Sequence, residues 1–152
     1  MRIEKRLEEL GIKLPEAPKP VAAYIPALKS GGLLYTAGQI PLAGGVLQFK
    51  GKVGQDLSLE EGYQAARLCT INGLAAAKGV LGDLDQIKRV VKVVVYVNSA
   101  PGFDQQPKVA NGASELLQAI FGEAGQHVRS AVGVSELPLG AAVEVELVLE
   151  TD

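Results

Sequence analysis

The 152-residue sequence has few of the side chains on which many enzymes depend, with one cysteine, one histidine and no tryptophan. A single cysteine excludes an internal disulfide framework, and one cysteine with one histidine cannot form a conventional zinc site. A serine–histidine–aspartate catalytic device would have to use His127, and we do not expect one. Cys69 falls in an apolar helical segment, which predicts a buried structural thiol. We expect no metal and no organic cofactor.

Charge is also sparse and nearly balanced, since charged residues make up 21% of the chain and the formal net charge is −2 at pH 7. The sequence has no basic run and no cluster of aromatic and basic residues, which argues against a nucleic-acid partner. No apolar run reaches the length of about 18 residues that a membrane span needs. The charged residues 1–10 lack the apolar core of a signal peptide. We therefore expect a cytoplasmic protein.

The apolar pattern predicts one α+β domain over residues 1–152, in which residues 1–20 form a short amphipathic helix and a proline-rich connector. Ser58 and Glu61 resemble a capping box at the start of a long helix. The expected elements are strands over 21–28, 33–40 and 46–49, a helix over 59–80, a strand over 89–97, a helix over 107–121, and a closing hairpin over 127–134 and 143–149. This order predicts a sandwich of one sheet with two helices on one face.

The closing hairpin carries the most informative charges. Arg129 shares its strand face with small residues, whereas Glu144 and Glu146 alternate with apolar side chains on the second strand. The planar arginine fork suits a carboxylate ligand, and a nearby glutamate can move protons or orient water. We expect these charges on the uncovered face of the sheet. A solvated cross-strand pair of modest value is the alternative interpretation.

The uncovered sheet face is expected to hold too many apolar side chains for open water. Self-association through that face would bury them. A cleft between subunits would then be a natural ligand site.

Two motifs, in this order and on these predicted strands, resemble the reactive-intermediate (enamine/imine) deaminases of the RidA family, also called endoribonuclease L-PSP-like proteins. The first is Thr36-Ala37-Gly38-Gln39-Ile40-Pro41. The second runs from Arg129-Ser130-Ala131 through Leu137-Pro138 to Val143-Glu144-Val145-Glu146, and the spacing from Arg129 to Glu144 is that of the family. The resemblance covers about residues 20–150. It implies a chorismate-mutase-like fold and a homotrimer with ligand clefts between subunits.

The resemblance also implies roles for particular residues. Arg129 would hold the carboxylate of a small-molecule substrate, and Glu144 would position or activate water near the reacting carbon. Tyr24 would line the cleft, Gly38 would offer backbone hydrogen bonds, and Asn111 would lie near the site. Tyr24 is equally well explained as a half-buried aromatic at a subunit seam, and Glu146 stays an alternative to Glu144.

Two departures from the family pattern bear on function. Ala37 stands where the family has a serine, and Ala131 stands where it has a cysteine; both positions remain candidate substrate contacts, in part through backbone atoms. The implied reaction is hydrolysis of a 2-imino acid, or its 2-aminoacrylate-type enamine, to a 2-oxo acid and ammonia. The alternative is a trimer that binds a small carboxylate metabolite without turning it over. Near-neutral charge and the lack of a histidine pair argue against a ribonuclease.

Overall fold

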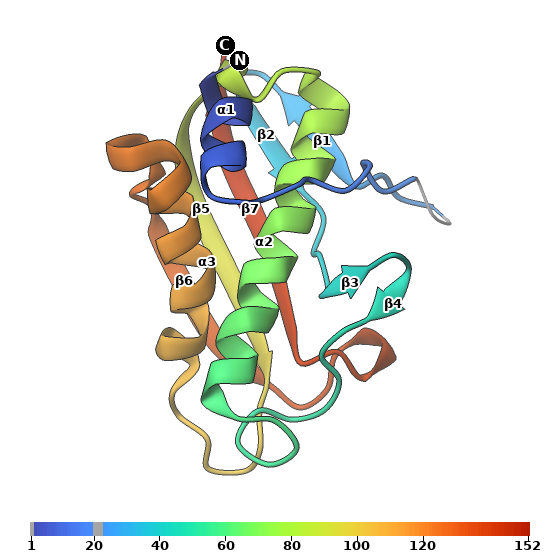
Figure 1. Ribbon diagram of the computed structural model, residues 1–152. Helices are drawn as coiled ribbons and strands as arrows, with labels where there is room; N and C mark the ends of the chain where they lie inside the picture. Colours follow the sequence, from blue (N-terminus) through green and yellow to red (C-terminus); the bar gives the residue numbers. More distant parts are fainter. Residues whose placement is uncertain (1, 20–22) are drawn as a thin grey trace.

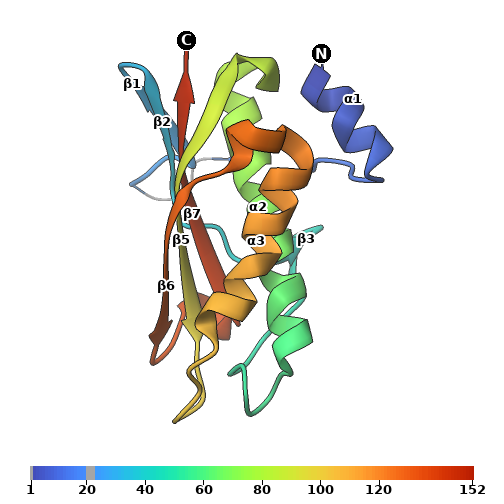
Figure 2. The same ribbon diagram turned by 90° about the vertical axis from the view of Figure 1, so that its left-hand side faces the viewer.

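One five-stranded sheet and two long helices form the main layers of the protein, as Figures 1 and 2 show. The computed structural model describes residues 2–19 and 23–152. The helices are α1 (Arg2–Glu9), α2 (Leu59–Leu81) and α3 (Gln106–Phe121). The strands are β1 (Ala27–Ser30), β2 (Leu33–Thr36), β3 (Leu42–Ala43), β4 (Val46–Leu47), β5 (Ile87–Asn98), β6 (Val128–Val134) and β7 (Val143–Thr151).

The strand order of the large sheet is β1-β2-β7-β5-β6, and the predicted closing hairpin is wrong. β6 pairs in parallel with β5, and β7 pairs antiparallel with both β5 and β2. Parallel neighbours need a long crossover, and α3 supplies it between β5 and β6. β7 alternates buried and half-buried residues along its whole length, so it gains most from having a neighbour on each side.

The two long helices begin and end where the sequence predicts them. Ser58 and Glu61 form the full capping box, in which each side chain binds the other residue's backbone N–H. Gly82 ends α2 with a φ of +77°, a conformation that glycine adopts without strain. Pro107 lies in the first turn of α3, where a missing backbone N–H breaks no hydrogen bond within the helix.

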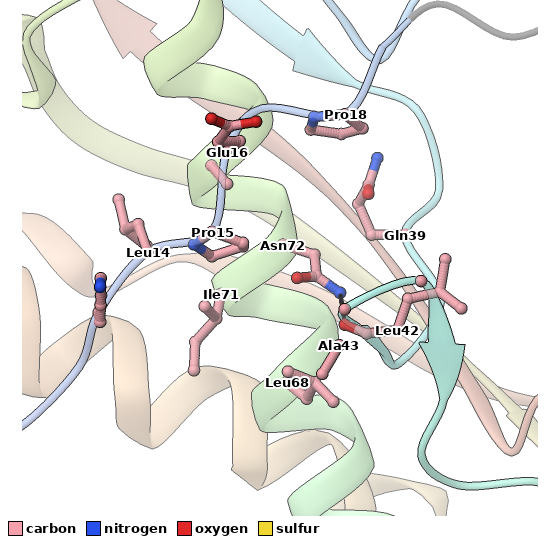
Figure 3. A pocket seen from close by; sticks show the side chains of 14 residues that line it. Leu14, Pro15, Glu16, Pro18, Gln39, Leu42, Ala43, Leu68, Ile71 and Asn72 are labelled. Carbon is pink, nitrogen blue, oxygen red and sulfur yellow. Dashed lines mark hydrogen bonds between the residues drawn. The ribbon is translucent and has the colours of Figure 1, made fainter.

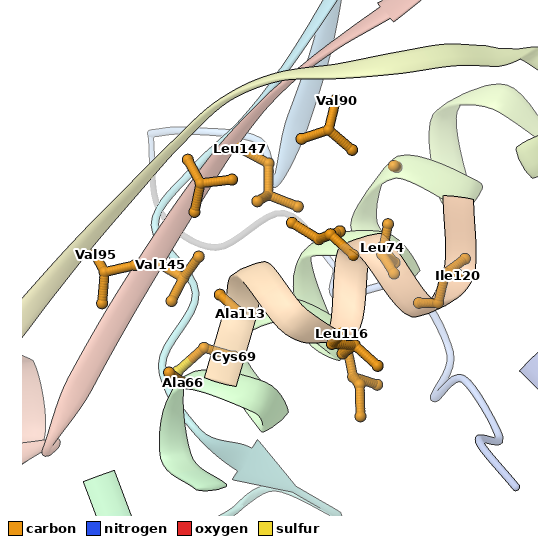
Figure 4. Packing of buried hydrophobic residues seen from close by; sticks show 14 of the residues in the cluster. Ala66, Cys69, Leu74, Val90, Val95, Ala113, Leu116, Ile120, Val145 and Leu147 are labelled. Carbon is orange, nitrogen blue, oxygen red and sulfur yellow. The ribbon is translucent and has the colours of Figure 1, made fainter. Parts of the chain in front are cut away.

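The core lies between the sheet and α2 with α3 (Figure 4). Alternate residues of β5 and β7 point into it, and Cys69 of α2 is fully buried there, as predicted. Burial raises the pKa of the Cys69 thiol well above its ordinary value. The sheet residues that face the helices include Val93, Val95, Val97, Val143, Val145, Leu147 and Leu149. Their neighbours in sequence point to the other face, over which no helix lies in Figure 2.

Three of the predicted strands are shorter than expected, and β4 covers only Val46–Leu47 of the expected 46–49. β1 begins only at Ala27, after Pro26, which has no N–H to donate to a neighbouring strand; residues 21 and 22 of the predicted strand lie outside the described residues. β2 ends at Thr36, and the chain rejoins β7 only at Gln39, which pairs with Val145. This break in pairing leaves Ala37 and Gly38 in a short irregular segment beside β7.

The N-terminal helix packs on the helical layer rather than on the sheet. Ile3 and Leu7 of α1 are buried, as its amphipathic pattern predicts. The backbone N–H groups of Arg2 and Ile3 donate to the carboxylate of Asp85, which holds the pKa of Asp85 at about 2. None of the helices in the described residues has both the length and the apolarity to cross a membrane.

The close approach of α2 and α3 depends on Gly112. A Cβ at this position would lie 2.0 Å from the carbonyl oxygen of Tyr63 on α2. We expect Gly112→Ala to force the helices apart and to lower the free energy of unfolding by about 2 kcal/mol, measured by denaturant titration. Gly32→Ala is the control, because a Cβ on Gly32 would lie at an ordinary van der Waals distance of 3.7 Å from the carbonyl oxygen of Thr151. Equal losses in the two variants would contradict the close-contact explanation.

Candidate functional site

Arg129 lies on the edge strand β6 and turns toward α3, not toward the uncovered sheet face as predicted. Its Cα partner on β5 is Val93, a buried core residue, so both side chains share the helix side of the sheet. Its Nη1 donates to Asn111 Oδ1 at 2.9 Å and to Ser114 Oγ at 3.0 Å. Within residues 2–19 and 23–152, no hydrogen bond reaches Nε or Nη2. One end of the half-buried guanidinium is therefore fixed, and the other is available to a ligand.

Ser114 and His127 continue the hydrogen-bonded network from Arg129, and neither residue is predicted for the site from the sequence. Ser114 Oγ lies 2.8 Å from His127 Nε2, and His127 Nδ1 lies 2.6 Å from the carbonyl oxygen of Gly125. Ser114 follows Asn111 by one helical turn on the same face of α3. His127 and Arg129 are two residues apart and point to the same side. Those two spacings are the signals that could have found the pair.

Glu144 occupies the opposite face of the sheet. Its Cα partner on β5 is Tyr96, and both point away from the helices. Burial is the main cause that raises the pKa of Glu144 above its usual value, and the charge of Glu146 adds to it. Within the described parts of the chain, the Glu144 carboxylate makes no hydrogen bond. Glu144 is thus a partly buried carboxyl group whose charge no hydrogen bond compensates within the described residues.

Gly38 leaves the space that the Glu144 carboxylate fills. A Cβ on Gly38 would lie 2.1 Å from Glu144 Oε2 and 2.7 Å from its carboxyl carbon. Gln39 fixes this approach, because its N–H donates to the carbonyl of Val145 at 2.8 Å and its carbonyl accepts from Val145 at 3.0 Å. The backbone N–H of Ala37 donates to the carbonyl of Pro26 at 2.7 Å. Predicted site residues Ala37, Gly38 and Glu144 therefore do form one cluster.

Glu146, the alternative to Glu144, is already engaged. Tyr96 donates its hydroxyl hydrogen to Glu146 Oε1 at 2.5 Å. This bond is the largest of the causes that raise the pKa of Tyr96 to about 12. Because Glu146 is bound to Tyr96 while Glu144 abuts Gly38, Glu144 is the better placed of the two for a ligand at the glycine.

The predicted residues form two half-sites within one chain. Arg129, Asn111 and Ala131 lie toward the helix side of the β6 edge, whereas Glu144 lies with Ala37 and Gly38 on the other face of the sheet. The expectation that Arg129 and Glu144 share a sheet face is wrong, because β5 separates their strands and the parity of the register differs. Tyr24 precedes β1, and its side chain is 59% exposed.

An apolar pocket of about 450 Å³ lies elsewhere, between the N-terminal connector, α2 and the β3–β4 hairpin (Figure 3). Leu68, Ile71 and Leu42 line it. Asn72 borders the pocket, and its side-chain amide nitrogen donates to the carbonyls of Ile40 and Leu42, at 3.0 Å each. No residue predicted for the site lines this pocket.

Among the described residues, no group of three or more histidine, cysteine, aspartate or glutamate side chains could hold a metal ion. An arginine can bind a carboxylate through two parallel hydrogen bonds, and a glutamate can accept or donate a proton.

The family described as "YjgF/chorismate_mutase-like, putative endoribonuclease" matches residues 4–151. The chain belongs to this family. The expected RidA-type membership and the chorismate-mutase-like α+β fold are confirmed.

Similar proteins cover the whole length of this RidA-family chain. Protein TCP17 of Trypanosoma cruzi is 47% identical over an alignment of 152 positions, which covers 98% of this chain and 94% of TCP17. The 2-iminobutanoate/2-iminopropanoate deaminase of Dermatophagoides farinae is 28% identical, over 91% of this chain and 93% of its own. The crystal structure of Atu1372 from Agrobacterium tumefaciens is 45% identical with a TM-score of 0.93, over 99% of this chain and 93% of that one.

The contact between Gly38 and Glu144 predicts that a side chain at position 38 lowers activity and leaves the stability of the fold nearly unchanged. We expect Gly38→Ala to displace the Glu144 carboxylate, which is the movable end of its side chain, and to lower any activity that needs Glu144 by about tenfold or more. Thermal unfolding should change little, because Gly38 does not require a positive φ. Gly32→Ala is the control, since its Cβ would meet only the carbonyl oxygen of Thr151 at an ordinary 3.7 Å. Unchanged activity in Gly38→Ala would exclude this positioning of Glu144.

The raised pKa of Glu144 predicts a pH-dependent effect on stability. The folded chain holds this proton more tightly than the unfolded chain, so ionised Glu144 opposes folding above its folded pKa. We expect Glu144→Gln to raise the melting temperature at about pH 7, and the gain to vanish below about pH 4, where the unfolded carboxyl is protonated as well. Thermal unfolding across this range checks it. A gain of the same size at every pH would show that the charge is not its cause.

Proposed function

We propose that the protein hydrolyses small 2-imino acids, or their 2-aminoacrylate-type enamine tautomers, to 2-oxo acids and ammonia. Water adds to the imine carbon, and the carbon–nitrogen bond then breaks as the nitrogen takes up a proton and leaves as ammonia. The name of the deaminase from Dermatophagoides farinae, a family member, supports this reaction class.

The observation that carries the proposal is the half-bound state of Arg129. Asn111 and Ser114 occupy Nη1, so the guanidinium can still present Nε and Nη2 as a parallel pair of donors. Such a pair matches the two oxygens of a carboxylate. Arg129 would therefore hold the substrate carboxylate, which is common to 2-imino and 2-oxo acids.

Glu144 would supply the proton transfers. Its raised pKa brings the carboxyl group closer to neutral pH, where a group can both accept a proton from water and return one to the leaving nitrogen. Gly38 lies against it and, within the described residues, makes no backbone hydrogen bond. The Gly38 N–H would thus be free to bind the substrate.

A site that contains both Arg129 and Glu144 needs two copies of the chain. The uncovered sheet face exposes large apolar side chains on both of its edges, among them Leu28, Tyr35, Val128 and Val132. A homotrimer that buries this face would place the β6 edge of one copy next to the β7 face of its neighbour. Each cleft would then join Arg129 and Asn111 of one copy to Glu144, Gly38 and Tyr24 of another.

Ala37 and Ala131 leave the cleft without a hydroxyl and a thiol that could contact the substrate. Neither group is needed to hold the carboxylate or to move the proton in this scheme. The lack of a hydroxyl at Ala37 and of a thiol at Ala131 nevertheless favours a second candidate function, in which the same cleft binds a small carboxylate metabolite without turning it over.

The decisive experiment mixes the protein with freshly generated 2-iminobutanoate or 2-aminoacrylate and follows 2-oxo acid formation. We expect acceleration over buffer, and a loss of about 100-fold or more in kcat/KM for Arg129→Ala because the carboxylate loses its bidentate partner. Arg129→Lys should recover only part of the loss, since an ammonium has no fork.

Arg89→Ala is the matched control, because the exposed Arg89 donates, within residues 2–19 and 23–152, only to the carbonyl of Gln126. Wild-type rates equal to those of buffer would refute the enzymatic proposal. Saturable binding of a 2-oxo acid that Arg129→Ala abolishes would, in that case, support the metabolite-binding trimer. A monomer by sedimentation would contradict the shared cleft.

A further inference from the structure

A directional chain of hydrogen bonds runs from Arg129 into the protein. The carbonyl oxygen of Gly125 can only accept, so His127 Nδ1 must carry a hydrogen. In the neutral imidazole, Nε2 is then the acceptor, and the Ser114 hydroxyl donates to it. The remaining lone pairs of Ser114 Oγ accept from Arg129 Nη1. Every donor in the chain has one acceptor, and the directions agree from end to end.

We propose that Ser114 and His127 are positioning residues that fix the Arg129 guanidinium in the orientation that binds a carboxylate. The inference rests on the proposed function, which supplies the carboxylate ligand. The hydrogen bonds themselves are part of the structure and do not depend on that function. Ser114 is 8% exposed on α3, and His127 is half-buried just before β6. Both are therefore held by the core, and they tie a flexible side chain on an edge strand to that core.

A nucleophilic role for Ser114 fits the geometry less well, although serine and histidine lie at the right distance. Ser114 is buried beneath Arg129, which donates to its oxygen. A hydrogen bond into the attacking lone pair lowers the nucleophilicity of a hydroxyl. The third member of the chain is the carbonyl of Gly125 rather than a carboxylate, so it orients the imidazole but stabilises a positive charge on it less than a carboxylate would.

The proposal predicts a particular kinetic signature. Arg129 holds the same carboxylate before and during the reaction, so loosening it should weaken ground-state and transition-state binding equally. We expect Ser114→Ala to raise KM about tenfold, the effect of about one charge-assisted hydrogen bond, and to leave kcat within about twofold. His127→Phe should do the same. The KM of the double variant should rise no further than that of either single variant, because each substitution breaks the same chain of hydrogen bonds.

Controls separate positioning from general damage. Thr70→Val removes another buried helical hydroxyl, which donates to the carbonyl of Ala66 on its own helix, and it should leave KM unchanged. Ser114→Thr keeps the hydroxyl and should restore most of the wild-type KM. Additive effects of Ser114→Ala and His127→Phe, or an equal rise of KM in Thr70→Val, would overturn the proposal.

Nitrogen-15 NMR on the whole protein tests the chain without any turnover. His127 is the lone histidine, so its tautomer can be assigned directly, and we expect hydrogen on Nδ1 at about pH 8. The Arg129 Nε–H should be ordered in the wild type and mobile in Ser114→Ala. Hydrogen on Nε2, or equal Arg129 mobility in both proteins, would overturn the positioning role. If these signals behave as expected while the wild type neither hydrolyses an imine nor binds a 2-oxo acid, the proposed function fails and the positioning role stands.

Discussion

The two-residue alternation of β7, enclosed between β2 and β5, is the constraint on which the rest of the molecule depends. Four of its side chains, Val143, Val145, Leu147 and Leu149, fill the core against α2 and α3. The same alternation obliges Glu144 and Glu146 to point the other way, whatever their function. A one-residue slip would bury both carboxylates and expose the core, so the register is fixed by the hydrophobic effect and the position of Glu144 follows from it.

The two halves of the candidate site are prepared by different means. The Arg129 half is polar and braced from α3, so the guanidinium is held by its neighbours before a ligand arrives. In the Glu144 half, the carboxylate occupies the space that a side chain at position 38 would fill, and Gly38 has no side chain. Neither half is a complete site. In the proposed scheme, the Arg129 half would bind the substrate carboxylate and the Glu144 half would exchange the proton, so the scheme requires a second copy of the chain.

Local patterns in the sequence were sufficient for the long elements and for most of the core. The capping box at Ser58 and Glu61, the apolar period of α2 and the valine run of β5 each carry their own signal, and each prediction is confirmed. The order of strands carries no such local signal. Neither β6 nor β7 taken alone indicates that β5 lies between them, so the hairpin prediction was wrong. The prediction that Arg129 and Glu144 share a sheet face depended on that hairpin and was wrong as well.

Side-chain networks were harder still to foresee. The resemblance identified Arg129, Glu144 and Gly38, whose contacts the structure now describes, but not Ser114 or His127. Their role depends on α3 packing beside β6, a tertiary contact between residues that each have an ordinary local explanation.

A crystal structure with 2-oxobutanoate bound would test the account most directly. It predicts that the acid's carboxylate meets Nε and Nη2 of Arg129, that Nη1 keeps its bonds to Asn111 and Ser114, and that Glu144 of a second copy faces the acid's carbonyl carbon. An acid seated in the apolar pocket beside Asn72, or on Arg129 with no Glu144 from any copy within reach, would contradict it.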